Sequence, residues 1–279
     1  MDKAKCSPGR GMTMSSNFGR DSELYIKTKS AGGVTILEDS YFTAPYKIAK
    51  PFYINGSNVM NVMVMCASAG IMEGDCYRVN IELGEGSRAA LLGQSYNKIH
   101  RMKGGCATQF NRFFLQHNTL FDYVQKPTIP FAGSSLNSVM ECHMKNNSAF
   151  LYSEVLSCGR DKMGECFEFK EYKSCSKVYY NDELVFLDNQ LLLPDCQSLG
   201  GIGFFEGHTH QAILAYFYEG YKEDLLDCLF DVMEHVEGIE FGLTRTKKHG
   251  IVVRILGDSG DLLEKVLTNL REVIMSRHT

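Results

Sequence analysis

The feature that most constrains the fold of this chain is a succession of short β-type segments between Glu23 and Asp188, separated by turn residues. Segments such as YRVNIEL and SKVYYND alternate apolar and polar residues and are rich in Val, Ile, Tyr and Phe, which is typical of strands with one buried face. No long stretch with helical periodicity occurs before about Gly207. This pattern predicts a mainly β protein.

A weak internal repeat suggests how these strands are arranged. The stretches LGEGSRAALL, LQHNTLFDYV and MKNNSAFLYS share an apolar residue, a polar turn, Gly or Asn, and then Ser or Thr before a new apolar run. The hydroxyl residues Ser87, Thr119 and Ser148 are 32 and 29 positions apart. Gly and Asn tolerate the positive φ that a tight turn requires. The repeat predicts stacked β-layers resembling a β-helix, and chance resemblance among hairpins is the alternative.

The C-terminal part is predicted to have the order β-α-β-β-α. One amphipathic helix is expected within 221–238, with Gly238 as its stop, and a second within 258–277, with Asp258 or Ser259 as its cap. We therefore expect a flexible tail over 1–22, a stacked β-layer region over 23–207 and an α+β region over 208–279. These regions are predicted to form one continuous domain with two α-helices near its end.

Composition excludes several classes of protein. The 279 residues are 44% hydrophobic and 22% charged, and the formal net charge is −4. Without a local run of basic residues, this balance gives no indication of nucleic-acid binding. The longest apolar run, 59–72, is too short and too interrupted to cross a membrane, and the first residues lack the apolar core of a signal peptide. We expect a cytoplasmic protein whose ten cysteines are free thiols.

Common catalytic and nucleotide-binding motifs are missing. Gly201-Ile202-Gly203 is followed by Glu206 where a dinucleotide fingerprint needs Gly, and neither a phosphate-binding lysine motif nor Gly-x-Ser-x-Gly occurs. A Cys/His dyad stays open because its partners need to meet only in space, so a small-molecule hydrolase on a β-rich fold is the alternative function. His208 and His210 are the local metal candidate, since residues i and i+2 of a strand share one face. A solvent-facing pair is the competing interpretation.

Two further stretches carry polar residues in unusual settings. In AGIMEGD, Gly70 and Gly74 frame a turn that ends on Asp75. In SEVLSCGRDKMGECFEF, the charged residues Glu154, Arg160 and Glu165 surround a turn built by two glycines. Buried carboxylates need partners, and Arg160 can supply a bidentate one. An ion pair that fixes a hairpin and a polar patch that lines a cavity are both consistent with this segment.

Four elements in this order resemble the family of urease accessory proteins called UreD, or UreH in some bacteria. They are AGIMEGD, QSYNKIH (94–100), PFAG (130–133) and SEVLSCGRDKMGECF. The resemblance extends from about Glu23 to the C-terminus. The family commonly has Pro-Gly-Gly where this chain has Ala69-Gly70-Ile71, and threonines are common in that family around the position of Gln94. The shape of the first loop is therefore expected to differ.

The resemblance implies a non-catalytic scaffold. Proteins of this family bind UreF, recruit the GTPase UreG and dock on apo-urease, where nickel then enters the urease active site; a homodimer within that complex is a further expectation. No permanently bound cofactor is implied, only transient Ni²⁺ moving through an internal tunnel. Asp75 and Glu165 are the residues proposed for this nickel path, and an oxygen ligand suits a cation that must be released. The polar interior and its supporting motif comprise Gly74, Gln94, Lys98, Glu154, Gly159, Arg160 and Gly164.

Overall fold

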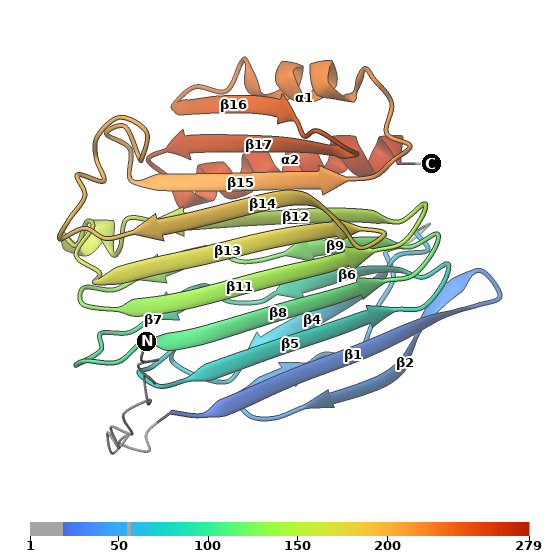
Figure 1. The fold of residues 1–279 in the computed structure, drawn as a ribbon, viewed down its shortest axis with the longest axis horizontal. Helices are drawn as coiled ribbons and strands as arrows, with labels where there is room; N and C mark the ends of the chain where they lie inside the picture. Colours follow the sequence, from blue (N-terminus) through green and yellow to red (C-terminus); the bar gives the residue numbers. More distant parts are fainter. Residues whose placement is uncertain (1–18, 55–56, 279) are drawn as a thin grey trace, which may run out of the picture.

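Two β-sheets lie face to face in the computed structural model, which describes residues 19–54 and 57–278 (Figure 1). The first sheet has seven strands, in the spatial order β14 (Glu183–Leu192), β13 (Glu171–Tyr180), β11 (Ser135–Met144), β8 (Ala107–Leu115), β5 (Cys76–Leu83), β1 (Asp21–Ala31) and β2 (Val34–Phe42). The main path of the second sheet has the order β16 (Ile239–Arg245), β17 (Gly250–Gly257), β15 (His210–Phe217), β12 (Ala149–Ser157), β9 (Leu120–Val124), β6 (Arg88–Gly93), β4 (Met60–Cys66) and β3 (Tyr46–Ile48). The mainly β fold is thereby confirmed.

The middle of the molecule is built from stacked coils of parallel strands. Each coil runs along the first sheet, turns into the second sheet and returns, so that β5, β8, β11 and β13 are parallel neighbours, as are β4, β6, β9 and β12. Two coils also contribute the short strands β7 (Asn97–Ile99) and β10 (Thr128–Pro130), which pair in parallel. Antiparallel strands such as β2 and β14 complete the edges of the stack.

The turns between the two sheets carry the repeat that the sequence predicted. Positive φ angles occur at Gly86 (72°), Asn118 (58°) and Asn147 (56°). The hydroxyl residue after each is buried, namely Ser87, Thr119 and Ser148. The coils are joined there by hydrogen bonds from Leu120 N to Ser87 O (3.0 Å) and from Ala149 N to Thr119 O (2.8 Å). The stacked-layer interpretation is therefore correct.

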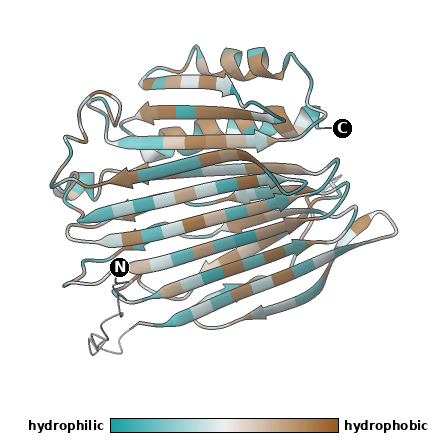
Figure 2. Cartoon of the chain, in the orientation of Figure 1, coloured by the Kyte–Doolittle hydropathy of each residue, from teal (hydrophilic) through white to brown (hydrophobic). Residues whose placement is uncertain are grey.

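The main core lies between the sheets. Strand residues alternate between this interior and the outer surface, which gives the banded hydropathy of the front strands in Figure 2. Aromatic rings from successive coils contact one another there: Phe113 lies edge-on to Phe121, and Phe121 stacks on Phe150 with 5.9 Å between ring centroids. These contacts tie neighbouring coils together across the interior.

A second core forms where the two helices cover the outer face of the second sheet. Helix α1 (Leu225–Met233) and helix α2 (Gly260–Arg277) pack with β15 and β17 in an apolar cluster (Figure 1). Ser259 is the cap of α2, and its hydroxyl accepts a hydrogen bond from Leu262 N at 3.3 Å. The predicted β-α-β-β-α order is confirmed.

Several boundaries of helices and strands in the structure differ from those predicted from the sequence. Helix α1 ends at Met233, before Gly238, and is followed by a turn in which Val236 N donates to the Met233 carbonyl. The stretch CFEFKEY (166–172) alternates apolar and polar residues in the way that predicts a strand. This prediction is wrong for residues 166–170, where Phe167 has a φ of 57° and donates its N–H to the Cys158 carbonyl. Strand β1 begins at Asp21, inside the expected tail, and residues 1–18 of that tail lie outside the described residues.

Among the helices of the described residues, none has both the length and the apolar character that a membrane span requires.

Candidate functional site

The loop between β12 and β13 holds Arg160 and Glu165 together. The short 3₁₀ helix η1 (Asp161–Met163) forms its tip, and Gly164 closes this turn at a φ of 82° with an N–H bond to the Asp161 carbonyl. Arg160 Nε donates to Glu165 Oε2 at 2.8 Å, and Nη2 donates to Oε1 of the same carboxylate. The bidentate ion pair expected from the sequence is present. The hydrogen bond from Arg160 lowers the pKa of Glu165.

The segment 130–133 packs against this loop, and the two form a unit that we call the loop unit (residues 130–133 and 158–166). Gly159 has a φ of 142°, and a Cβ there would lie 2.8 Å from the Glu165 carbonyl oxygen and 3.3 Å from that of Pro130. Ala132 N donates to Glu165 Oε2 at 3.2 Å. The close approach of three backbone segments therefore requires glycine at position 159.

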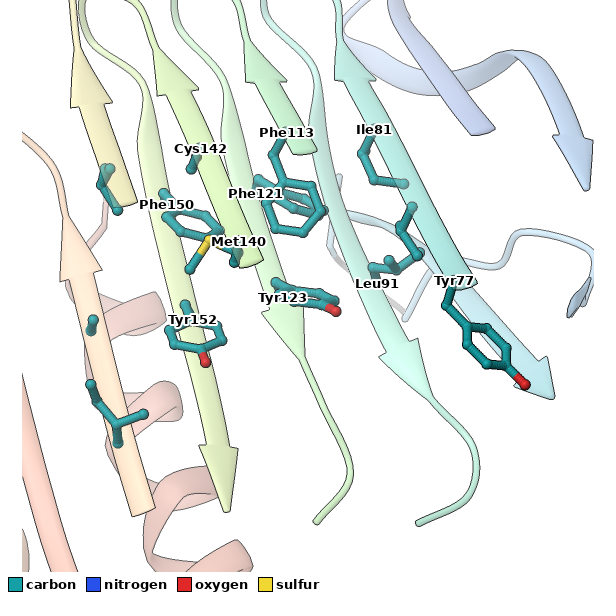
Figure 3. Close-up of a cluster of buried hydrophobic side chains, with 14 of the residues drawn as sticks. Tyr77, Ile81, Leu91, Phe113, Phe121, Tyr123, Met140, Cys142, Phe150 and Tyr152 are labelled. Atoms are coloured by element: carbon teal, nitrogen blue, oxygen red, sulfur yellow. The ribbon is translucent and has the colours of Figure 1, made fainter. Parts of the chain in front are cut away.

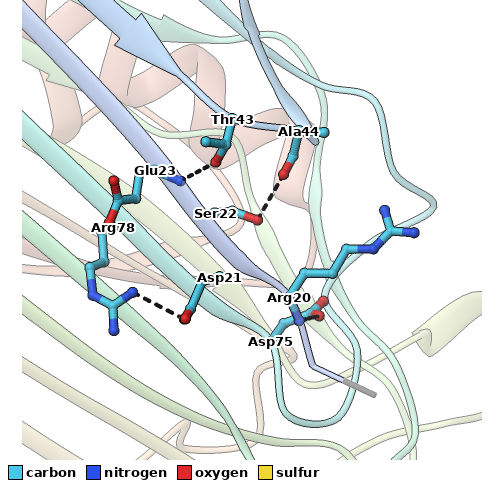
Figure 4. A network of polar contacts seen from close by, with 8 residues as sticks. All are labelled: Arg20, Asp21, Ser22, Glu23, Thr43, Ala44, Asp75 and Arg78. Atoms are coloured by element: carbon cyan, nitrogen blue, oxygen red, sulfur yellow. Dashed lines mark hydrogen bonds and ion pairs between the residues drawn. The ribbon is translucent and has the colours of Figure 1, made fainter. Parts of the chain in front are cut away.

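Asp75 closes the turn that follows β4. Its carboxylate accepts hydrogen bonds from Met72 N (2.8 Å) and from Arg20 N (3.1 Å), which ties the start of β1 to this turn (Figure 4). The Tyr77 hydroxyl lies 3.4 Å from Asp75 Oδ2. Gly74 precedes it with a φ of 80° and meets Gly19 closely. Asp75 is buried and has a defined role in holding the turn.

Gln94 and Lys98 line a cavity with a volume of about 470 Å³. It lies beside the AGIMEGD turn, since Gly70 belongs to its lining, and Tyr77 and Tyr123 are in its wall. A Cβ at Gly70 would lie 2.4 Å from the Lys98 carbonyl oxygen, so this glycine lets the turn approach β7. Asp75 reaches the cavity only through its contact with Tyr77, because the carboxylate is not part of the lining.

Glu154 lies away from Arg160 and Glu165, between the two sheets. It lines a small polar cavity of about 20 Å³ together with Asp188 and Arg254, which form an ion pair at 2.7 Å. The hydroxyls of Tyr152 and Tyr172 donate hydrogen bonds to the Glu154 carboxylate. Burial is the main cause that raises the pKa of Glu154, so its charged form is disfavoured. The sequence grouping of Glu154 with the loop residues is not reproduced in space.

A row of tyrosines that was not predicted from the sequence lies between the cavity at Gln94 and the cavity at Glu154. Tyr77, Tyr123 and Tyr152 lie one after another between the sheets (Figure 3). Tyr123 and Tyr152 are stacked with 6.1 Å between their ring centroids. They come from neighbouring coils and occupy the same place in the repeats LFDYV and AFLYS, which is the signal that could have revealed them. The row supplies hydroxyl groups in an otherwise apolar interior.

His208 and His210 do not form a shared metal site. His208 Nδ1 lies 3.3 Å from Asp258 Oδ2, whereas His210 Nδ1 lies 2.8 Å from the Thr209 hydroxyl. Within residues 19–54 and 57–278, no group of three or more His, Cys, Asp and Glu side chains is arranged to hold a metal ion. The described carboxylates of the interior therefore do not form a closed coordination shell.

The parallel coils with two helices near the C-terminus define a fold of the β-solenoid class. Residues 20–279 match the family model described as UreD urease accessory protein. The chain belongs to the UreD family.

Similar proteins with established names support this family membership. The chain is 53% identical over 261 residues to the urease accessory protein UreD of Acetivibrio thermocellus, covering 94% of this chain and 100% of that protein. It is 33% identical to UreD of Flavobacterium johnsoniae over 87% of this chain and 88% of the relative. It is 30% identical to UreH of Helicobacter hepaticus over 93% and 96%. Membership of this family supports a role in urease maturation.

Proposed function

We propose that this protein is a non-catalytic scaffold in urease maturation, which joins UreF and the GTPase UreG, docks on apo-urease in the cytoplasm and supports nickel insertion. The observation that carries the proposal is the family match over residues 20–279, together with full-length coverage of the Acetivibrio thermocellus relative. A rigid stack of coils suits this task because its surfaces keep fixed relative positions while partners bind and leave.

The alternative of a Cys/His hydrolase loses support from the state of the buried thiols. A nucleophilic cysteine needs a lowered pKa. Burial instead raises the pKa of Cys66, Cys142 and Cys158. A raised pKa disfavours the thiolate, so none of these three thiols is activated as the nucleophile of a hydrolase.

We further propose that Ni²⁺ passes through the interior as transient cargo. Support comes from the row of tyrosines between the 470 Å³ cavity and the smaller cavity at Glu154. Neutral hydroxyls and single carboxylates hold a hydrated divalent cation weakly enough for release. Asp75 would act where its carboxylate meets Tyr77, and Glu154 where its carboxylate accepts from Tyr152 at the other end of the row. Glu165 would act from the loop unit, where Arg160 moderates its charge.

Complex formation is tested by co-expression of the tagged chain with UreF, UreG and apo-urease, followed by affinity capture and mass analysis. Stoichiometric recovery of UreF, and of UreG and apo-urease through it, is the expected result; the subunit count from native mass analysis also decides whether two copies of this chain are present. A folded chain that captures none of the three proteins would refute the scaffold proposal.

The nickel path is tested by Asp75→Ala and Glu154→Gln in complexes that assemble normally. We expect reduced nickel content of urease with both. Glu73→Gln is the matched control, because Glu73 lies in the same turn as Asp75 but its carboxylate faces outward and accepts bonds from Lys103 N and Gly105 N. Full urease activation with Asp75→Ala would remove Asp75 from the path, and the same result with Glu154→Gln would remove Glu154.

A further inference from the structure

The loop unit contains two cysteines at the two ends of its loop. Cys158 is the first residue after β12, and Cys166 follows Glu165. Phe167 N donates to the Cys158 carbonyl at 2.7 Å, and Gly159 meets the carbonyl of Glu165. The chain therefore runs back alongside itself, so that residues 158 and 166 are neighbours across the neck of the loop. The Cys166 side chain is close enough to the Cys158 thiol to raise the pKa of that thiol.

The two thiols have different access to solvent. Cys166 is exposed, whereas Cys158 is fully buried. Burial raises the pKa of Cys158, and the neighbouring Cys166 raises it further. An exposed thiol paired with a buried one is the arrangement in which the first reacts with a small reagent and the second reacts only with its neighbour.

We propose that Cys158 and Cys166 form a redox-active dithiol, which low-molecular-weight disulfides such as oxidised glutathione convert into a disulfide that locks the loop. The Cys166 thiolate attacks one sulfur of the reagent, forms a mixed disulfide and releases one glutathione thiolate. Cys158 then loses its proton to solvent and attacks Cys166 Sγ, which releases the second thiolate. Two protein thiols are oxidised and one glutathione disulfide is reduced to two glutathione molecules.

The order of these steps follows from the exposure of Cys166 and the burial of Cys158, and the electrostatics of the pair favour the same order. While Cys166 is a thiolate, its charge opposes ionisation of Cys158. Conversion of Cys166 into a neutral mixed disulfide removes that opposition, so the buried thiol becomes more acidic only after the exposed one has reacted. The backbone hydrogen bond from Phe167 N to the Cys158 carbonyl holds residues 158 and 166 next to each other across the neck, so the attacking thiol is already near the sulfur that it attacks.

Formation of the disulfide would fix the ion pair that lies within the loop. Arg160 and Glu165 both lie between the two cysteines, and Arg160 also covers the Phe131 ring. In the reduced protein, backbone hydrogen bonds and this ion pair close the neck of the loop. A disulfide would add a covalent closure there and hold Arg160 and Glu165 against 130–133 irrespective of pH and salt.

The tryptic cleavage sites in the sequence allow the disulfide to be detected directly. Trypsin cuts after Arg160 and Lys162, which places Cys158 in the peptide 146–160 and Cys166 in the peptide 163–170, and each peptide holds a single cysteine. Reduced full-length protein is incubated with oxidised glutathione, free thiols are blocked, and the digest is analysed without reduction. We expect the linked pair of these two peptides as the main disulfide product, at least about tenfold enriched over protein oxidised in urea.

Variants separate the proposal from random oxidation. Cys166→Ser should abolish the linked pair, and Cys158→Ser should leave a stable glutathione adduct on Cys166. Cys106→Ser, which removes another exposed thiol, should leave the product unchanged. Glutathione that stays on Cys166 in the wild-type protein without a link would overturn the proposal. Links spread equally over Cys106, Cys166 and Cys196 would do the same.

Discussion

The guanidinium carbon of Arg160 lies 4.2 Å from the centre of the Phe131 ring, while the same group forms the bidentate ion pair with Glu165. One side chain thus joins the loop after β12 to the segment before β11. Such a site depends on the planar fork of arginine, because a lysine ammonium can neither stack on the ring nor bond both carboxylate oxygens in the same geometry.

Arg160→Lys should release the Glu165 carboxylate from its fixed position. Ala132 N donates to that carboxylate at 3.2 Å, so its amide hydrogen should exchange roughly tenfold faster in the variant. Gly133 N is the internal control, because it donates at 2.8 Å to the backbone carbonyl of Glu168 and should keep its rate. Hydrogen exchange followed by NMR measures both amides; equal acceleration of both would indicate general loosening instead.

Glu154 and Glu165 should respond to pH in opposite directions. Burial is the main cause that raises the pKa of Glu154 in the folded protein above its unfolded value of about 4.5. The contribution of Glu154 to stability is therefore fully present below pH 4.5, and it is lost as the pH rises through the pKa of the folded state. Glu154→Gln should therefore gain stability relative to the wild type between pH 4 and pH 7. Urea unfolding at several pH values in this range measures the change.

The pKa of Glu165 is lowered mainly by its hydrogen bond from Arg160, so its contribution is present above the unfolded pKa and is lost as pH falls through the folded value. Glu165→Gln should therefore be less stable than the wild type at pH 7, and the difference should disappear in acid. Parallel pH profiles for Glu154→Gln and Glu165→Gln would contradict the opposite environments assigned to the two carboxylates.

The two glycines of the loop should differ in their tolerance of alanine. At Gly159 an added Cβ meets the Glu165 carbonyl oxygen at 2.8 Å, so Gly159→Ala should force the loop apart and cost about 3 kcal/mol or more. At Gly164 nothing lies within 4 Å, so Gly164→Ala should cost only about 1 kcal/mol, for its positive φ. Thermal or urea unfolding compares them, and similar losses would argue against the close packing at Gly159.

The buried hydroxyls at the turns should not contribute equally. Thr119 Oγ1 donates to the Gln116 carbonyl at 2.9 Å, so Thr119→Val should cost about 1 kcal/mol and Thr119→Ser should restore the bond. The Ser87 hydroxyl has no partner among the described residues, so Ser87→Ala should change the stability little. Unfolding free energies decide, and a larger loss for Ser87→Ala than for Thr119→Val would reverse this ranking.

The ion pair between Asp122 on β9 and Arg271 on α2 should show the cost of an unpaired buried charge. Asp122 is only 3% exposed, and Arg271 donates from Nε at 3.2 Å and from Nη2. Arg271→Met should cost about 3 kcal/mol, because it leaves the carboxylate buried without a partner. The double variant with Asp122→Asn should recover part of this loss, and additive losses in the urea-unfolding cycle would contradict the coupling.

Turn chemistry is what made the fold predictable from the sequence. Gly86, Asn118 and Asn147 mark places where the chain must adopt positive φ, and the same residues repeat because each coil turns at the same place. The helix cap at Ser259 could be predicted for a similar reason, because it depends only on local hydrogen bonds. Features fixed within a few residues can be inferred without knowing the tertiary structure.

The polar interior was less predictable because it depends on which faces meet. Glu154 is close to Arg160 in the sequence, but β12 alternates between two covered faces, and Tyr152, Glu154 and Leu156 share the one that faces the other sheet. Phe167 and Phe169 alternate with polar residues as in a strand, yet Phe167 packs on Phe205 in an irregular turn. The periodicity of a segment indicates which of its residues are buried, but it does not indicate which other segment buries them.

The parallel coils of the middle region differ from one another by little more than a translation along the stack, about 4.8 Å for each coil. The antiparallel strands β2 and β14 stand at the two edges of the first sheet and do not depend on how many coils separate them. The number of coils consequently sets the distance between the two ends of the stack. Duplication of a unit such as 107–134 would lengthen it by one increment and move its two ends apart, while each end kept its own surface.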